Sequence, residues 1–163
     1  PYQRGYPVVA PQLEILRPAA ENAGINLIEV PADNGEELTS LLQELSASEN
    51  MENTAILGLV EPLLVTSDGF GSAAEFAGEP QFPLGGAMYP REGYGSIFYV
   101  SVDARETGVQ AALQADKILQ GTAAGTIPVI SSDMTLIINN KQADDLGLVV
   151  PDELLTMANE VMR

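Results

Sequence analysis

The sequence predicts an α/β fold in which a parallel sheet is flanked by helices. The clearest observation is the stretch of residues 96–121, where a β-branched and aromatic segment runs to Asp103 and a helix pattern follows. Asp103 can accept the free N–H groups at the helix start, and Gly121 fits a left-handed stop. A second observation is the nearly continuous apolar run at residues 55–60, typical of a strand buried on both faces of a parallel sheet. The third is the alternation of strand and helix patterns.

Apolar residues at helical spacing predict the helices, and short apolar or β-branched runs predict the strands. The predicted helices are residues 8–23, 34–45, 68–77, 104–120, 141–146 and 152–162. The predicted strands are residues 25–30, 55–60, 82–88, 96–103, 127–131 and 135–138, and residues 1–7 and 61–67 are expected to form loops. Pro18 is expected to kink the first helix or to end its first half, and Gly24 to stop it. Asn34 with Glu37, and Asn140, are the expected caps of two later helices.

Composition limits the classes of function. The chain has 163 residues and is 45% apolar, enough for one ordinary domain with a real core. Its 23 acidic and 7 basic residues give a net charge of −16, which opposes binding to nucleic acid or to anionic membrane surfaces. Histidine and cysteine are absent, which excludes Ser-His and Cys-His pairs and the usual zinc sites. No metal and no cofactor are expected, since the phosphate-binding glycine motifs are also missing.

The best local site candidate is the loop of residues 61–70. It follows the carboxyl end of the predicted central strand and opens a helix, where free N–H groups favour an anionic ligand group. Glu61 begins the loop, Thr66 and Ser67 supply hydroxyls, and Phe70 supplies an apolar face. The alternative is that Thr66 or Ser67 only caps the helix and that Phe70 only packs in the core.

Further candidates follow the next two predicted strands. Residues 85–88, which end in Met88, either line a pocket or allow tight packing. Tyr94 is either an aromatic side chain in a cleft or an anchor of its own loop. Asp103 is first of all a helix cap, with ligand binding as a second role. The adjacent carboxylate pairs are expected to be solvated, because sequence neighbours on a helix do not face one another.

The carboxyl-terminal part of the chain carries a series of short motifs. They are Ile127-Pro128-Val129, Ile138-Asn139-Asn140-Lys141, Leu146-Gly147-Leu148 and Pro151-x-x-Leu154-Leu155, with Tyr94-Gly95-Ser96, Asp103 and Gly108-x-x-Ala111-Ala112 upstream. These motifs resemble the tail of the ABC-transporter substrate-binding protein family, in particular the branch associated with aromatic amino-acid transport. The resemblance is specific from Phe82 onward and lies at the level of pattern before it.

The resemblance implies a type I periplasmic-binding-protein-like fold. In such receptors two α/β lobes are joined by crossing strands, and closure on a ligand in the cleft creates the state that a membrane permease recognises. Residues 1–163 would be the C-terminal lobe and the interlobe return segments, without the N-terminal lobe, the opening strand or the signal peptide of the precursor. The protein would be periplasmic or extracellular, with or without a lipid anchor. The family also places Thr66, Ser67 and Phe70 along the cleft.

Two functions from different classes are therefore predicted. The first is the solute-binding component of an ABC importer, not an enzyme, which takes a small amino-acid-like or organic ligand and presents it to a permease. The alternative is a small α/β hydrolase or isomerase that uses Ser67 and carboxylates. If the opening strand is absent, unpaired edges and apolar faces favour a homo-oligomer. The small-residue helix face with Gly108, Ala111, Ala112 and Ala115 is then expected to be exposed or covered by a neighbouring chain.

Overall fold

The strands of the computed structural model, which describes residues 1–78, 81–86 and 95–163, form two sheets. The larger sheet has the order β3 (Ile56–Gly58), β4 (Leu84–Gly86), β5 (Phe98–Val102), β6 (Met134–Asn139) and β7 (Glu160–Met162). Its neighbours run parallel except β5 and β6, which run antiparallel. The smaller sheet is the parallel pair β1 (Tyr2–Gln3) and β2 (Pro31–Ala32). The predicted α/β fold, with its mostly parallel sheet, is confirmed.

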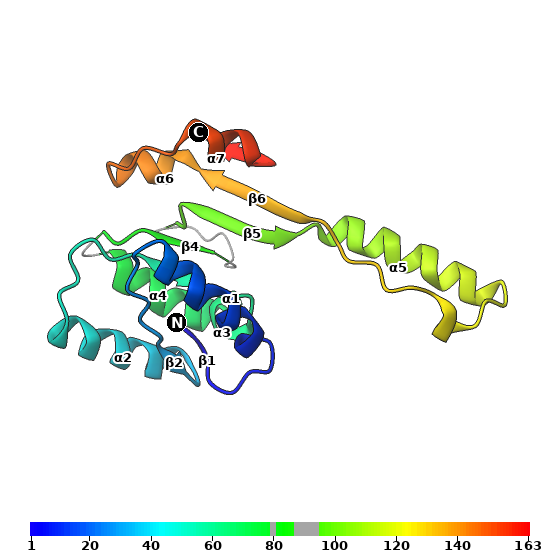
Figure 1. Cartoon of the computed structure of the whole chain (residues 1–163), viewed down its shortest axis with the longest axis horizontal. Coiled ribbons are helices and arrows are strands. Elements are labelled where there is room, and N and C mark those ends of the chain that lie inside the picture. The colour runs from blue at the N-terminus through cyan, green and yellow to red at the C-terminus, as the bar shows by residue number, and fades with distance from the viewer. Residues whose placement is uncertain (79–80, 87–94) are drawn as a thin grey trace.

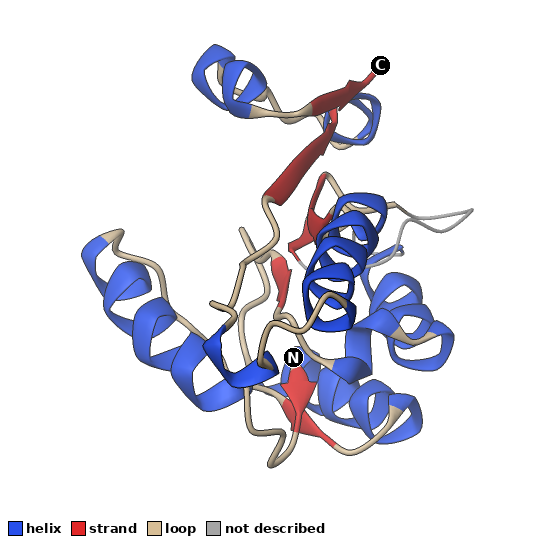
Figure 2. Cartoon of the chain, turned by 90° about the vertical axis from the view of Figure 1, so that its right-hand side faces the viewer, coloured by secondary structure: helices blue, strands red, loops and turns tan. Residues whose placement is uncertain are grey.

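The helices divide between a body, formed by the described residues up to 86, and an arm, formed by residues 103–133 (Figures 1 and 2). Two further short helices lie near the carboxyl end of the chain. The helices are α1 (Val9–Asn22), α2 (Gly35–Ser48), α3 (Pro62–Val65), α4 (Ser67–Gly78), α5 (Ala104–Leu119), α6 (Asn140–Asp145) and α7 (Asp152–Met157), with a 3-10 turn at Ala124–Thr126. The first four helices gather around β1 to β4, and α6 and α7 lie beside β6. Helix α5 projects beyond β5, away from the other helices (Figure 1).

The main core lies where α2, α3 and α4 pack against β2, β3 and β4. Its largest fully buried apolar side chains are Leu38, Leu64, Phe70 and Leu84. A smaller cluster joins the first two turns of α1 to the residue after β3, and consists of Val9, Leu13 and Leu59. The two clusters hold the amino-terminal part of the chain, with α1 on one of them and α2 and α4 on the other.

Strand β3 is covered unevenly on its two faces. Ile56 is 6% exposed and packs in the main core, whereas Leu57, which points to the opposite face, is 37% exposed. The prediction of a strand buried on both faces is therefore wrong for β3. On the Leu57 side, the buried cluster around Leu59 lies beyond the end of the strand.

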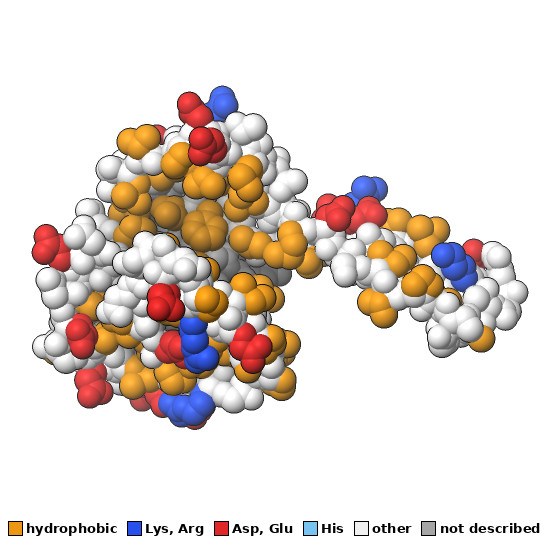
Figure 3. Space-filling model, viewed as in Figure 1, with side chains coloured by type: hydrophobic (Ala, Val, Ile, Leu, Met, Phe, Trp, Pro, Cys, Tyr) orange, Lys and Arg blue, Asp and Glu red, His pale blue; other side chains and the backbone are white. Residues whose placement is uncertain are grey.

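The arm is the least packed part of the described chain. None of the residues of α5 is buried, and its small-residue face (Gly108, Ala111, Ala112 and Ala115) is exposed as predicted. Large apolar side chains of the arm are also exposed, among them Leu113 at 60% and Leu119 at 86% (Figure 3). Strands β5 and β6 connect the arm to the body. Ser101 and Val102 pair only with β6 among the described strands, so the two strands leave the sheet as a two-stranded ribbon.

Two of the predicted strands are wrong. Residues 25–30 are irregular. The strand beside them, β1, consists only of Tyr2 and Gln3, and these two residues pair with Pro31 and Ala32 of β2, so residues 25–30 have no strand partner among the described residues. Residues 1–7 are not all loop either, because Tyr2 and Gln3 form β1 and pair with β2, so the expectation that a strand before the first helix is absent is wrong. Residues 127–131 are also irregular, and Val129 is 96% exposed, since no described strand lies beside it.

The predicted final helix over residues 152–162 is divided into α7 and β7. Asn159 is the physical reason, because its N–H donates to the Leu136 carbonyl at 2.8 Å and its side-chain oxygen accepts the Leu136 N–H at 2.8 Å. These bonds draw the tail onto β6. Two further differences are that α1 continues through Pro18 and that residues 61–67 contain the short helix α3.

The predicted caps are confirmed at two helices and displaced at a third. Asn34 accepts the Glu37 N–H at 2.9 Å at the start of α2. Asp103 accepts two N–H groups from the first turn of α5, at 2.8 and 2.9 Å. Helix α6 is capped by Asn139 rather than by Asn140. These bonds satisfy N–H groups that have no partner within the helix.

A three-residue polar cluster fastens α1 to the segment that precedes β2. The Arg17 guanidinium binds both carboxylate oxygens of Glu29, at 2.7 and 3.0 Å, and the Tyr2 hydroxyl donates to the same carboxylate at 3.0 Å. The hydrogen bonds from Arg17, and to a smaller extent the bond from Tyr2, hold the pKa of Glu29 below its ordinary value of 4.5. The cluster therefore stabilises the fold only while Glu29 is ionised.

We expect Glu29→Gln to flatten the acid side of the pH-stability profile. A carboxylate whose pKa is lowered by folding adds stability above its unfolded pKa, and this contribution is lost as pH falls through the lowered value. Urea midpoints of the parent and the variant should therefore differ at neutral pH and converge below pH 4.5, the ordinary value for Glu29. The control is Glu44→Gln on the exposed side of α2, which removes the same charge. Equal profiles for the two variants would contradict the role of this cluster.

Candidate functional site

The carboxyl ends of the parallel strands place several loops at one edge of the body. Strands β3 and β4 are parallel, so the loops that follow them leave at the same edge. The loop after β1 lies beside the loop after β3, because the Gln3 N–H donates to Glu61 at 3.0 Å. This edge is where open α/β sheets bind ligands.

Glu61 joins two of these loops. Its side chain is 4% exposed, and its carboxylate accepts the Leu63 N–H at 2.7 Å and the Leu64 N–H at 3.2 Å in addition to the Gln3 N–H. The first two bonds cap α3, and the third ties that cap to the end of β1. Glu61, predicted as a site residue, is thus directed at backbone groups and fixes the shape of the edge.

The other predicted residues of the 61–70 loop lie at the junction of α3 and α4. The Thr66 hydroxyl donates to the Leu63 carbonyl at 2.8 Å and accepts the Gly69 N–H at 3.4 Å, which matches the capping alternative. Ser67 is exposed at the start of α4. Phe70 is 1% exposed and belongs to the main core, as the packing alternative predicts, so it presents no aromatic face to solvent. In that core it lies in one cluster with side chains of α2 and α3.

Two predicted residues, Met88 and Tyr94, lie outside the described residues. The glycines before Met88 allow close packing. A Cβ on Gly85 would collide with the Phe98 ring, and one on Gly86, whose φ is +112°, would collide with the Gly58 carbonyl of β3. Strands β3, β4 and β5 therefore approach closely just before the edge.

Gln12 was not identified from the sequence. Its side-chain amide donates to the Val8 carbonyl at 2.8 Å and to the Val60 carbonyl at 3.0 Å, and it accepts the Val60 N–H at 2.9 Å. It therefore clamps the start of α1 against the loop after β3. The sequence carried no signal for this role, since Gln12 appeared only as one polar residue of a predicted helix.

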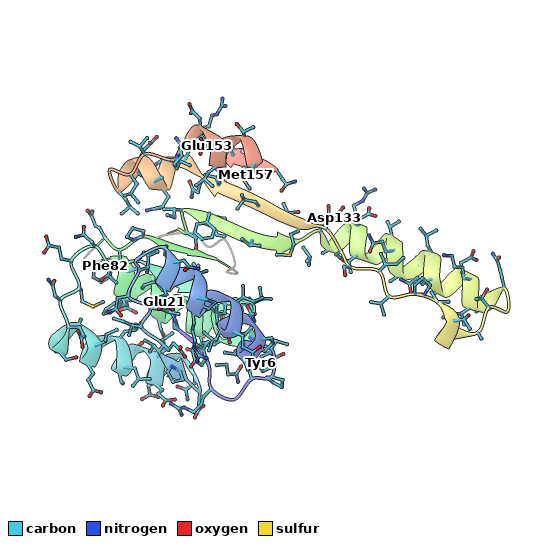
Figure 4. The ribbon with its side chains drawn as sticks, in the orientation of Figure 1. Tyr6, Glu21, Phe82, Asp133, Glu153 and Met157 are labelled. Atoms are coloured by element: carbon cyan, nitrogen blue, oxygen red, sulfur yellow. The ribbon has the colours of Figure 1, made fainter. Side chains whose placement is uncertain are left out.

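Three exposed apolar side chains belong to the two segments that this clamp joins, and we call them the edge patch. Tyr6 is 38% exposed, Val8 is 45% exposed and Val60 is 55% exposed. Figure 4 shows Tyr6 at the beginning of α1, at the opposite end from Glu21. No side chain caps α1 at Val8, but the Val9 N–H donates to the Tyr6 carbonyl at 3.1 Å and Pro11 has no N–H, so within residues 9–11 the Ala10 N–H is the one left for another acceptor. The edge thus offers an apolar surface beside polar backbone groups.

The described residues carry neither a metal site nor a membrane span. No group of three or more acidic side chains among them is arranged to hold a metal ion, and none of their helices is long and apolar enough to cross a bilayer.

The family model for ABC transporter substrate binding proteins matches residues 2–162. The chain belongs to this family. Among curated proteins, no sequence matches this chain at a significant level. The family match agrees with the resemblance predicted from the carboxyl-terminal motifs.

Three solved structures share the fold of this chain. A conserved domain protein from Vibrio cholerae has a TM-score of 0.75 and 24% identity, over 98% of this chain and 52% of that one. An ABC domain in complex with L-Trp from Streptococcus pneumonia has a TM-score of 0.76 and 21% identity, over 99% and 54%. The ligand-free, open form of a substrate-binding protein with adhesive properties from Clostridium difficile has a TM-score of 0.61 and 18% identity, over 99% and 52%. The chain thus spans about half the length of these structures.

We expect Glu61→Ala to destabilise the chain by about 1–3 kcal/mol, because it leaves the Leu63 and Leu64 N–H groups buried without their acceptor. Glu61→Gln keeps one carbonyl acceptor and should cost less. Urea unfolding measures both, with Glu44→Ala on the exposed side of α2 as the control. If Glu61→Ala and Glu44→Ala shift the midpoint equally, Glu61 does not hold the edge together.

Proposed function

We propose that this chain is part of the solute-binding component of an ABC importer. It binds a small amino-acid-like or organic solute at the edge formed by the carboxyl ends of the parallel strands. It presents this solute to a membrane permease from the periplasmic or extracellular side. The observation that carries the proposal is the family match over residues 2–162. The L-Trp complex of a structural neighbour supports an amino-acid-like solute.

The geometry of the edge supports the same proposal. An amino acid has a carboxylate and an apolar or polar side chain. The start of α1 suits the carboxylate, since the positive end of a 14-residue helix favours an anion and the Ala10 N–H is left to donate. The edge patch suits an apolar side chain. Thr66, Ser67, Met88 and Tyr94 stay proposed contacts, and Phe70 and Glu61 contribute by shaping the edge from within.

We further propose that the chain is the carboxyl-terminal lobe of a two-lobed receptor, with its return segments. Three features support this arrangement. The matched structures are about twice as long as the matched region, α5 has no buried residue, and β5 and β6 lead out of the sheet as a pair. A cleft between two lobes would be completed by the other half, and closure about the β5–β6 crossing would follow ligand binding.

The enzyme alternative assigns Ser67 as a nucleophile activated by carboxylates. Glu61 accepts backbone N–H groups of three residues, and Asp68 accepts the Gly35 N–H at 3.0 Å. These carboxylates therefore have structural uses, which favours a binding protein. We propose that the chain has no catalytic activity of its own, and the binding experiment includes a test of this.

Titration with L-tryptophan tests the proposed function directly. The chain contains no tryptophan, so the fluorescence of the ligand can be followed without an indole background from the protein. We expect binding weaker than micromolar, because half of the cleft contacts would come from the other lobe, and we expect a rise in thermal midpoint at saturating ligand. A panel of amino acids and small organic acids under the same conditions identifies the preferred class.

Ser67→Ala serves as the matched variant in this titration. Binding without turnover, in both the parent and the variant, supports the receptor. Turnover of any compound in the panel that Ser67→Ala abolishes would establish the enzyme instead. Micromolar affinity of the 163-residue chain alone would contradict the proposed division of the cleft between two lobes.

We also propose that the isolated chain self-associates through the arm, because α5 exposes apolar side chains such as Leu113 and Leu119. The net charge of −16 opposes this association, so added salt should increase it. Light scattering at high protein concentration is expected to report a mass above that of the monomer, and Leu113→Asp to lower it. Ser40→Asp, on the exposed side of α2, is the control. A monomer at high salt and high concentration would refute this expectation.

A further inference from the structure

We propose that Gln12 is a positioning residue for solute selectivity: it fixes the spacing of the edge patch, which then receives the apolar side chain of an amino-acid-like solute. The inference rests on the proposed function and names the part of the solute that this half of the cleft recognises. It is carried by the three hydrogen bonds of the Gln12 amide and by the three exposed apolar side chains of the two segments that these bonds join.

The hydrogen bonds require an amide side chain at this position. The Val60 N–H and carbonyl are both bound by Gln12, at 2.9 and 3.0 Å, so the side chain must accept and donate at once. Glutamate cannot donate, and lysine and arginine cannot accept. The same NH2 group also binds the Val8 carbonyl at 2.8 Å, so one amide joins the backbones of Val8 and Val60.

A second connection makes this clamp rigid. Val60 is followed by Glu61, whose carboxylate holds the Gln3 N–H. The loop after β1 is therefore tied to residues 60 and 61 at both of its ends, at Gln3 before it and at Val8 after it. Beneath these ties lies the small buried cluster of Val9, Leu13 and Leu59. The backbone positions that carry the edge patch are thus fixed before any solute binds.

The chemistry of the edge patch indicates the class of group that it takes. Tyr6, Val8 and Val60 contribute an aromatic ring and two branched aliphatic side chains, each 38% to 55% exposed. Arg4, the nearest basic residue in sequence, is engaged by Asp33 at 2.8 Å and by Glu37 at 2.6 Å. An apolar solute side chain would gain free energy by leaving water for this surface, whereas a hydroxymethyl group would gain little.

Affinity for two amino acids and exchange of one amide together test the inference. The probes are L-tryptophan and L-serine, and the variants are Gln12→Ala, Gln12→Glu and the control Gln43→Ala on the exposed side of α2. For both Gln12 variants we expect faster hydrogen exchange of the Val60 N–H. We expect L-tryptophan affinity to fall by about tenfold, the size of one or two lost hydrogen bonds, while L-serine affinity changes little. Val60→Ser should lower the ratio of L-tryptophan affinity to L-serine affinity and leave the N–H of residue 60 protected from exchange.

The outcomes separate this inference from the proposed function. If the Gln12 variants lose affinity for both amino acids equally, or if Val60 exchange does not change, Gln12 has no role in selectivity and the inference is overturned. If the parent binds no amino acid in the panel, the proposed function fails, and the selectivity inference that rests on it is overturned as well. Val60 exchange still reports in that case whether the clamp exists.

Discussion

The carboxylate of Glu61 is the constraint on which the candidate site depends. It is buried at the end of β3 and accepts N–H groups from both β1 and α3, so a single side chain decides how two neighbouring loops meet. Gln12 adds a second tie one residue earlier in the same loop. Hydrogen bonds hold the exposed apolar residues of this edge in place, because hydrogen bonds have a preferred direction and apolar contacts do not.

The body and the arm follow opposite designs. In the body, α2, α3 and α4 enclose a core in which Leu38, Leu64 and Leu84 are completely buried. In the arm, α5 has equally good local signals, a capped start and a left-handed glycine after its end, yet none of its residues is buried. Local signals therefore determine where a helix forms, and they do not determine whether a surface exists to receive it.

The same distinction explains how much could be predicted from the sequence. Caps at Asn34 and Asp103 were predictable because each depends on residues within one helical turn. Residues 25–30 and 127–131 have strand composition, but a strand needs a partner, and the partner is fixed by distant parts of the chain. At the site, the place of Glu61 after a strand predicts a ligand contact, and the local pattern does not indicate that its carboxylate accepts backbone N–H groups from β1 and α3. For Phe70 the packing alternative holds, which the sequence alone left open. Gln12 was not found, because its partner Val60 lies 48 residues away.

The ribbon formed by β5 and β6 has a mechanical consequence. Beyond the sheet, Ser101 and Val102 are bonded only to β6 among the described strands, and the bonds of an antiparallel pair run across the ribbon. Such a ribbon resists stretching, since its length is set by extended backbone, but it twists readily because no third strand restrains it. Whatever is attached to α5 can thus rotate about the long axis of the ribbon without sliding along it. The chain runs through the ribbon twice, outward as β5 and back as β6. Rotation at one end of the ribbon therefore leaves the register between the two strands unchanged.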